Sequence, residues 1–142
     1  MSFLNTKKAL IQRLLDNLPP QISPDHIYYE NDELDPTGID NWLACYFIPA
    51  TSESLGKTIA SSDQCEGIFQ ISIFTKANAG VYDNEQLAIA DAIRLAFPYG
   101  STTIYDSQTV HITETELAAG EGINSWLRRD LSVNYFSFSV RN

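Results

Sequence analysis

Two neighbouring segments in the middle of the chain have clear but different hydrophobic periods. Residues 66–75 alternate like a β-strand, and their second side is also partly apolar, so we expect both faces of their sheet to be covered. From about Asn84, apolar residues recur at helical spacing up to Phe97, which predicts an amphipathic helix with Asp83 at its N-cap. The strand residues on the more apolar side are Phe69, Ile71 and Ile73.

The remaining pattern predicts a small α+β fold. A first helix is expected at 5–18, before Pro19-Pro20, and a turn at 118–122. Pro49 is expected to end one strand, and residues 50–63, rich in small polar residues, to form a long mobile loop. The expected strands are 27–29, 41–48, 66–75, 102–105, 109–115 and 126–140. We therefore expect a twisted, mixed and mostly antiparallel sheet with two main helices packed on it, in one domain over residues 1–142.

The last predicted strand changes phase along its length. Leu131, Val133 and Tyr135 share one face, whereas Phe136 and Phe138 share the other. Val140 continues the second set. Either a β-bulge shifts the strand, or its end buries the opposite face in another subunit.

Charge narrows the range of partners. The 142-residue chain carries a net charge of -9, and its nine Lys and Arg residues never form a run longer than two. Nucleic-acid binding requires clustered positive charge, so we expect no nucleic-acid partner. No apolar run approaches the length of a membrane span, and the first residues do not resemble a signal peptide. We therefore expect no membrane partner and a reducing compartment.

Catalytic and metal motifs are missing from the sequence. It has no Gly-rich phosphate loop and no nucleophile elbow, and its two Cys and two His residues are scattered. Cys45 and Cys65 lie on two strands expected to be neighbours, so a disulfide is geometrically possible, although we expect free thiols. Glu114 and Glu116 share a strand face and are expected to face solvent. We expect neither catalytic residues nor a cofactor nor a metal.

Four short patches, in order, resemble the phage tail-terminator-like family, which is related to the tail terminator of lambda-like siphophages. They are Tyr29-Glu30-Asn31, the strand Gly67-Ile68-Phe69-Gln70-Ile71-Ser72-Ile73, the Ala-rich helix ending in Phe97-Pro98-Tyr99-Gly100, and the closing strand with Val133, Tyr135 and Phe136. Together they span residues 27–140. The segment after Asn31 departs from the family pattern, and residues 50–63 match nothing firmly.

The resemblance implies a virion structural protein and not an enzyme. It implies a ring, usually a hexamer, that forms on the finished end of the tail tube, stops its polymerisation and presents a surface to the head connector. Its partners would be copies of itself, the tail tube protein and the head–tail connector protein, with assembly in the host bacterial cytoplasm. Two alternatives stay open: a head-completion adaptor of the head–tail joint, and a small enzyme of unknown type.

We predict the subunit interface from two segments, the expected loop at 50–63 and the closing strand with the residues before it. Leu55 and Ile59 are isolated apolar residues of the expected loop, and Lys57 lies between them. Arg128 and Arg129 precede the closing strand and are either ordinary surface charge or an interface ion pair. The complete predicted interface set is Leu55, Lys57, Ile59, Arg128, Arg129, Phe136 and Phe138.

Overall fold

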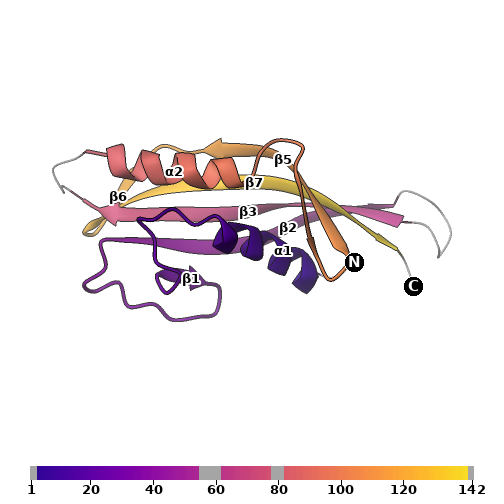
Figure 1. The fold of residues 1–142 in the computed structure, drawn as a ribbon, viewed down its shortest axis with the longest axis horizontal. Coiled ribbons are helices and arrows are strands. Elements are labelled where there is room, and N and C mark those ends of the chain that lie inside the picture. The colour runs from indigo at the N-terminus through magenta and orange to yellow at the C-terminus, as the bar shows by residue number, and fades with distance from the viewer. Residues whose placement is uncertain (1–2, 55–61, 78–81, 141–142) are drawn as a thin grey trace.

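The computed structural model describes residues 3–54, 62–77 and 82–140, which contain two helices and seven strands (Figure 1). The helices are α1 (Phe3–Asp16) and α2 (Asn84–Ala96). The strands are β1 (Ile27–Tyr29), β2 (Asn41–Ser54), β3 (Ser62–Lys76), β4 (Thr102–Tyr105), β5 (Gln108–Leu117), β6 (Glu121–Ile123) and β7 (Trp126–Val140).

All strands belong to one curled sheet with the order β1-β2-β3-β7-β5-β4, and β6 pairs with β7. β1 runs parallel to β2, whereas the other pairs are antiparallel. The sheet is built around β3 and β7, which pair along their whole length from Ser62↔Val140 to Lys76↔Trp126. The predicted fold class, a mixed and mostly antiparallel sheet with two helices, is confirmed.

Both helices pack on the same face of the sheet, where their apolar stripes meet the alternate residues of the central strands. The helix after β3 ends at Ala96 as predicted, and Phe97 turns into the core against Phe69, with ring centroids 6.1 Å apart. The first helix ends at Asp16, two residues before the predicted boundary. The buried core includes Leu10, Leu14, Leu43, Ile71, Ile73, Ile89, Ile93, Ile112, Leu131 and Val133.

A polar network attaches the start of α2 to the sheet. The buried Gln86 donates from Nε2 to the carbonyl oxygens of Ile73 and Leu127, at 3.0 and 2.9 Å. Arg129 donates from Nε to Gln86 Oε1 at 3.2 Å and pairs with Asp83 at 3.0 Å. Asp83 does occupy the N-cap position, but it makes no side-chain cap bond because its carboxylate binds Arg129.

The prediction that Pro49 ends a strand is wrong. β2 continues to Ser54, because a register shift between Pro49 and Thr51 places the proline, which has no N–H, at a bulge. β3 in turn begins at Ser62, so the expected loop at 50–63 is wrong for 50–54 and for 62–63. Residues 55–61 lie outside the described residues. The expected turn at 118–122 is also too long, since β6 begins at Glu121.

The cysteines are too far apart for a disulfide. Cys45 pairs in register with Ile71, which lies six residues along β3 from Cys65. At roughly 3.3 Å per residue, this places the two thiols roughly 20 Å apart along the strands. Both are buried and neither forms a disulfide, so the possibility of a disulfide between them is excluded by the register.

Candidate interaction surfaces

The second face of the sheet carries no helix in the described residues, which corrects the expectation that both faces are covered. Its side chains come from the same strands that build the core, shifted by one residue. β3 contributes Ile68, Gln70, Ser72 and Phe74, and β7 contributes the residues opposite them in register. We call this surface the helix-free face.

One end of the helix-free face is an aromatic cluster that is largely self-covered. Trp42 stacks on Phe74 with ring centroids 3.9 Å apart, and Trp126 meets Trp42 edge-on at 5.9 Å. The guanidinium of Arg128 lies 5.8 Å from the centroid of the Phe74 ring. Phe74 is therefore only 8% exposed although no described helix covers it. This cluster extends the core and offers little free apolar area.

A polar strip crosses the middle of the helix-free face. Ser72 donates from Oγ to Asp130 Oδ1 at 2.6 Å, and Arg128 donates from Nε to the same oxygen at 3.0 Å. Gln70 donates from Nε2 to Ser72 Oγ at 3.3 Å. The charged groups and hydrogen-bond donors of this strip are paired with one another, so the strip does not require a partner. It lies between the two aromatic ends of the face.

The other end of the face, near the end of β7, exposes an aromatic patch formed by His111, Phe136 and Phe138. His111 stacks on Phe136 at 4.6 Å, and Phe138 meets both rings edge-on at 5.9 and 5.5 Å. Phe138 is 42% exposed. The exposed Glu66 pairs in register with Phe136, so a carboxylate borders the patch. The aromatic patch is the part of this face that is suited to a partner.

No bulge in the β3–β7 ladder causes the phase change predicted for the last strand. β7 keeps one register with β3 throughout, and Ser137 follows Tyr135 on the core face. The shift lies instead in the pairing of β5 with β7, between Ile112 and Thr115. Phe136 and Phe138 therefore belong to a regular strand whose outer face becomes apolar only toward its C-terminal end.

Side chains bind a backbone group at two edge positions of the sheet, on β2 beyond its pairing with β1 and on β4. On β2, the carboxylate of Glu30 accepts the backbone N–H of Phe47 at 2.7 Å, and Pro49 and its bulge follow. On β4, Arg13 donates from Nη1 to the carbonyl oxygen of Thr102 at 3.1 Å. Capped, bulged and proline-containing edges resist pairing with another strand. Contacts between copies are therefore expected to use the faces of the sheet.

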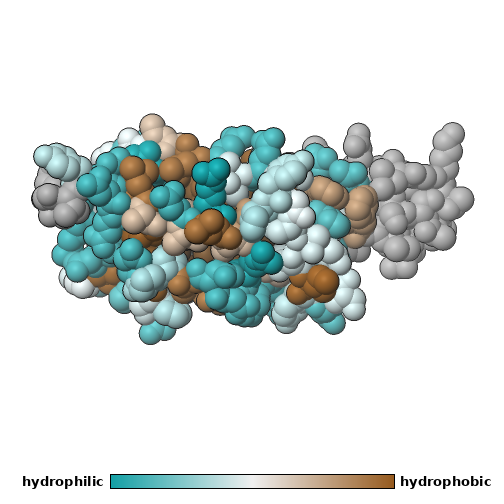
Figure 2. Space-filling model, turned by 45° about the horizontal axis from the view of Figure 1, so that its top comes forward, coloured by the Kyte–Doolittle hydropathy of each residue, from teal (hydrophilic) through white to brown (hydrophobic). Residues whose placement is uncertain are grey.

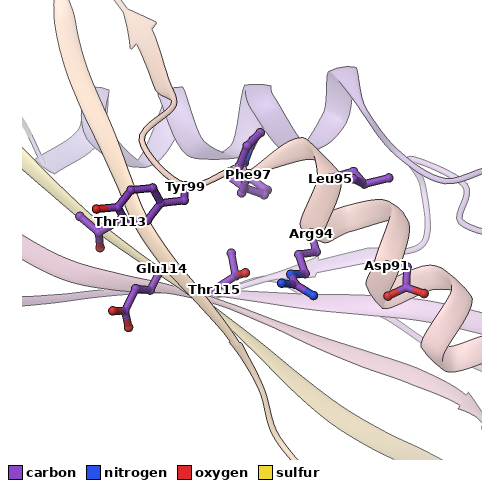
Figure 3. Close-up of a pocket in the computed structure, with 9 residues that line it drawn as sticks. Asp91, Arg94, Leu95, Phe97, Tyr99, Thr113, Glu114 and Thr115 are labelled. Atoms are coloured by element: carbon purple, nitrogen blue, oxygen red, sulfur yellow. The ribbon is translucent and has the colours of Figure 1, made fainter.

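The helix-bearing side has a cleft of about 680 Å³ between the end of α2 and β5 (Figure 3). It forms because Phe97 turns inward after the helix, and because the β5 shift after Ile112 inserts extra backbone opposite it. Hydrophobic residues reach the surface among hydrophilic ones on the side where α2 lies (Figure 2). The cleft is lined by Asp91, Arg94, Leu95, Phe97, Pro98, Tyr99, Thr113, Glu114 and Thr115.

The rim of the cleft combines free apolar surface with a free cation. Leu95 is 80% exposed and Tyr99 is 84% exposed. Arg94 extends from α2 toward Thr115 of β5 (Figure 3), and it forms no ion pair with any described residue. Asp91 and Glu114 also line the cleft, so an apolar partner that carries a carboxylate is matched only where that carboxylate meets Arg94.

The predicted interface residues fall into three groups. Leu55, Lys57 and Ile59 lie outside the described residues. Arg128 and Arg129 each form an ion pair within the chain, with Asp130 and Asp83, so an intermolecular role for them stays a prediction. Phe136 and Phe138 lie side by side in the aromatic patch.

Sequence reasoning missed the cleft, although one signal was present. Leu95 is a large apolar residue outside the buried stripe of α2, whose buried members include Ile89, Ile93 and Ala96. An apolar residue on the polar side of an amphipathic helix marks exposed hydrophobic surface. That β5 lies beside it could not be read from the chain.

Reactive chemistry is limited among the described residues. They contain no group of three or more His, Cys, Asp or Glu side chains placed to hold a metal. Burial raises the pKa of the Cys45 thiol to about 12, which keeps it protonated at neutral pH. Glu114 and Glu116 are both exposed on β5, as expected. Within the described part of the chain, neither helix has the length and apolar content needed to span a membrane.

Comparison with known proteins gives a structure with the same fold and a matching family. One solved structure, with 19% sequence identity, superposes with a TM-score of 0.73 over 96% of each chain, which shows a shared fold. No curated protein matches the sequence. A family model described as "Phage tail terminator protein" matches residues 5–135, nearly the whole chain. The protein is a structural component of a bacteriophage tail. It belongs to the phage tail terminator family, as the sequence patches predicted.

Proposed function

We propose that this chain forms a ring that sits on the end of the tail tube. The resemblance implies that the ring is a hexamer. The ring stops tube polymerisation and presents its other surface to the head connector. The observation that carries this proposal is the family match over residues 5–135. Assembly then takes place in the host bacterial cytoplasm, and the ring stays in the virion tail.

The surface features support this role. The aromatic patch and the cleft belong to opposite sides of one sheet, and Glu30 and Arg13 each bind a backbone group at an edge position of the sheet. Contacts between unlike surfaces of identical subunits produce rings when the rotation closes. The net charge of -9 opposes association of free subunits, so we expect the tube end to act as a template for the ring.

The test adds the purified protein to polymerising tail tube subunits and measures tube length by electron microscopy. We expect tubes of reduced length that carry an additional ring at one end. Tubes that lengthen unchanged, with no ring, would contradict the terminator role and favour a head-completion adaptor. In that case the protein would bind the head connector without affecting the tube.

A further inference from the structure

The cleft at the end of α2 and the aromatic patch have complementary properties. The cleft is a hollow with an exposed apolar rim, Leu95 and Tyr99, and a cation, Arg94, that no described residue pairs with. The aromatic patch projects the 42% exposed Phe138 beside the carboxylate of Glu66.

Glu66 is an unpaired charge that borders the aromatic patch. It is exposed, it accepts a hydrogen bond from Gln64 Nε2 at 3.0 Å, and no described cation pairs with it. By contrast, the acid in the polar strip of the same face, Asp130, is neutralised by Arg128. The helix-free face therefore places an uncompensated carboxylate, Glu66, next to Phe138, the most exposed aromatic residue described on this face.

We propose that the cleft binds the aromatic patch of a second copy of this chain, head to tail, with Phe138 entering the cleft and Glu66 paired with Arg94. This contact rests on the proposed ring and identifies the two surfaces that build it. Apolar burial supplies the attraction, and the ion pair sets orientation and partner choice.

The spacing of the two groups suits this contact. Glu66 pairs in register with Phe136, and Phe138 is the next residue of β7 on the same face. Such diagonal neighbours in a sheet lie about 7–8 Å apart, which is within the reach of one arginine side chain from the cleft. Asp91 and Glu114, also in the cleft, repel Glu66 in other positions and so fix the register.

Because the two surfaces are unlike and lie on opposite sides of the sheet, the contact is heterologous. Each copy then uses its cleft for one neighbour and its patch for the other, which leads to a closed ring if the rotation permits. A twofold dimer would need the cleft and the patch of each copy to meet the same neighbour at once, which their placement on opposite sides of the sheet does not allow.

A cysteine pair tests the geometry directly. One batch carries Asp91→Cys, in the cleft, and another carries Gln64→Cys, at the position opposite Phe138 in register, so that Phe138, Leu95, Glu66 and Arg94 all remain. The native Cys45 and Cys65 are buried. After mild oxidation of the mixture, with and without tube ends, we expect disulfide-linked dimers at least tenfold above a mixture in which the exposed Thr37→Cys replaces Gln64→Cys. Equal linking in the two mixtures would overturn the contact.

A charge exchange tests the ion pair. Arg94→Glu alone and Glu66→Arg alone should each lose at least tenfold in subunit association, measured by sedimentation and by rings on tube ends. A 1:1 mixture should recover, because alternating copies restore opposite charges at every contact. Lys8→Glu and Glu33→Arg change the net charge equally, lie outside both surfaces and should behave like the unmodified chain.

The outcomes separate the contact from the terminator role. If the mixture fails to recover, or if neither single variant loses association, the contact is wrong even where the unmodified protein stops tube growth. If the cysteine and charge tests succeed while tubes keep lengthening, the contact stands and the terminator role falls.

Discussion

The two faces of the sheet are made by alternate residues of the same strands, yet they have opposite characters. On the helix-covered face, Ile71, Ile73 and Val133 are fully buried beneath α1 and α2. On the helix-free face, Phe138 is 42% exposed and the polar strip around Ser72 satisfies itself. Stability and association are thus divided between the two sides of one sheet, and substitutions on each side should have separable effects.

The largest effect is expected on the covered face. Phe97→Ala removes a ring that is 1% exposed and packs on Phe69, so the free energy of unfolding should fall by about 3–5 kcal/mol. Leu95→Ala, two residues earlier but 80% exposed, should change it by less than about 0.5 kcal/mol. Urea unfolding of both variants checks the contrast, and equal midpoints would contradict the assignment of Phe97 to the core.

A smaller effect is expected where backbone and ring approach closely. A Cβ at Gly67 would lie 2.5 Å from the Tyr135 hydroxyl oxygen and 2.6 Å from the Ile48 carbonyl oxygen. Gly67→Ala should therefore cost about 1–3 kcal/mol, because both the Tyr135 ring and the Ile48 backbone must shift.

The matched control is Gly122→Ala, because no atom lies within 4 Å of a Cβ at that position. Its melting temperature should stay within a degree or two of the unmodified protein. A Gly67→Ala variant as stable as this control would contradict the close packing of Tyr135 and the Ile48 backbone on Gly67.

Alkaline pH should weaken the covered face next. Burial raises the pKa of Cys45 from 9.0 to about 12, so between these values the unfolded chain has lost a proton that the folded chain retains. The free energy of unfolding should therefore fall as pH rises above 9, by at most about 1.4 kcal/mol per pH unit from this thiol. Burial also raises the pKa of Tyr29 and Tyr46, which adds to the loss at higher pH.

Urea unfolding at pH 8.0, 9.5 and 10.5 measures this effect. Cys45→Ala removes the thiol and should make the decline shallower, although the variant starts from a lower stability. An unchanged slope in that variant would assign the alkaline loss to the tyrosines instead.

The smallest effect on stability, and the largest on association, is expected on the helix-free face. Phe138→Ala should lower the free energy of unfolding by less than about 1 kcal/mol, because the side chain is already 42% exposed. The same variant should lose ring formation on tube ends. Normal rings with this variant would remove the aromatic patch from the interface.

Much of this architecture could be predicted from local patterns. The alternation around Phe69 and the helical stripe through Ile93 each belong to one element, so the sequence carries them directly. The error at Pro49 arose because a single bulge allows a strand to continue past a proline. The prediction that the second face of β3 is covered was also wrong. Trp42, Phe74 and Arg128 pack on one another there, so Phe74 is buried without a helix.

The candidate surfaces were only half predictable. Phe136 and Phe138 alternate with core residues of one strand, so their shared outer face followed from the sequence. The cleft joins Leu95 and Tyr99 to Thr115, which meet only through the strand order β7-β5-β4. That order depends on pairing between distant segments, and it has no local signal.

The position of β7 in the sheet also governs how the chain can fold during synthesis. β7 is the last described strand to leave the ribosome, yet it lies between β3 and β5 in the sheet. Ser62 of β3 therefore cannot pair with its partner Val140 until the end of β7 has been synthesised. Pairing across such long sequence separations slows folding. Until then the nascent chain has local helices and the β2–β3 and β4–β5 hairpins, but no joined sheet. Neither complementary surface exists in complete form at that stage, so the subunit becomes competent to assemble only after its closing strand has been made.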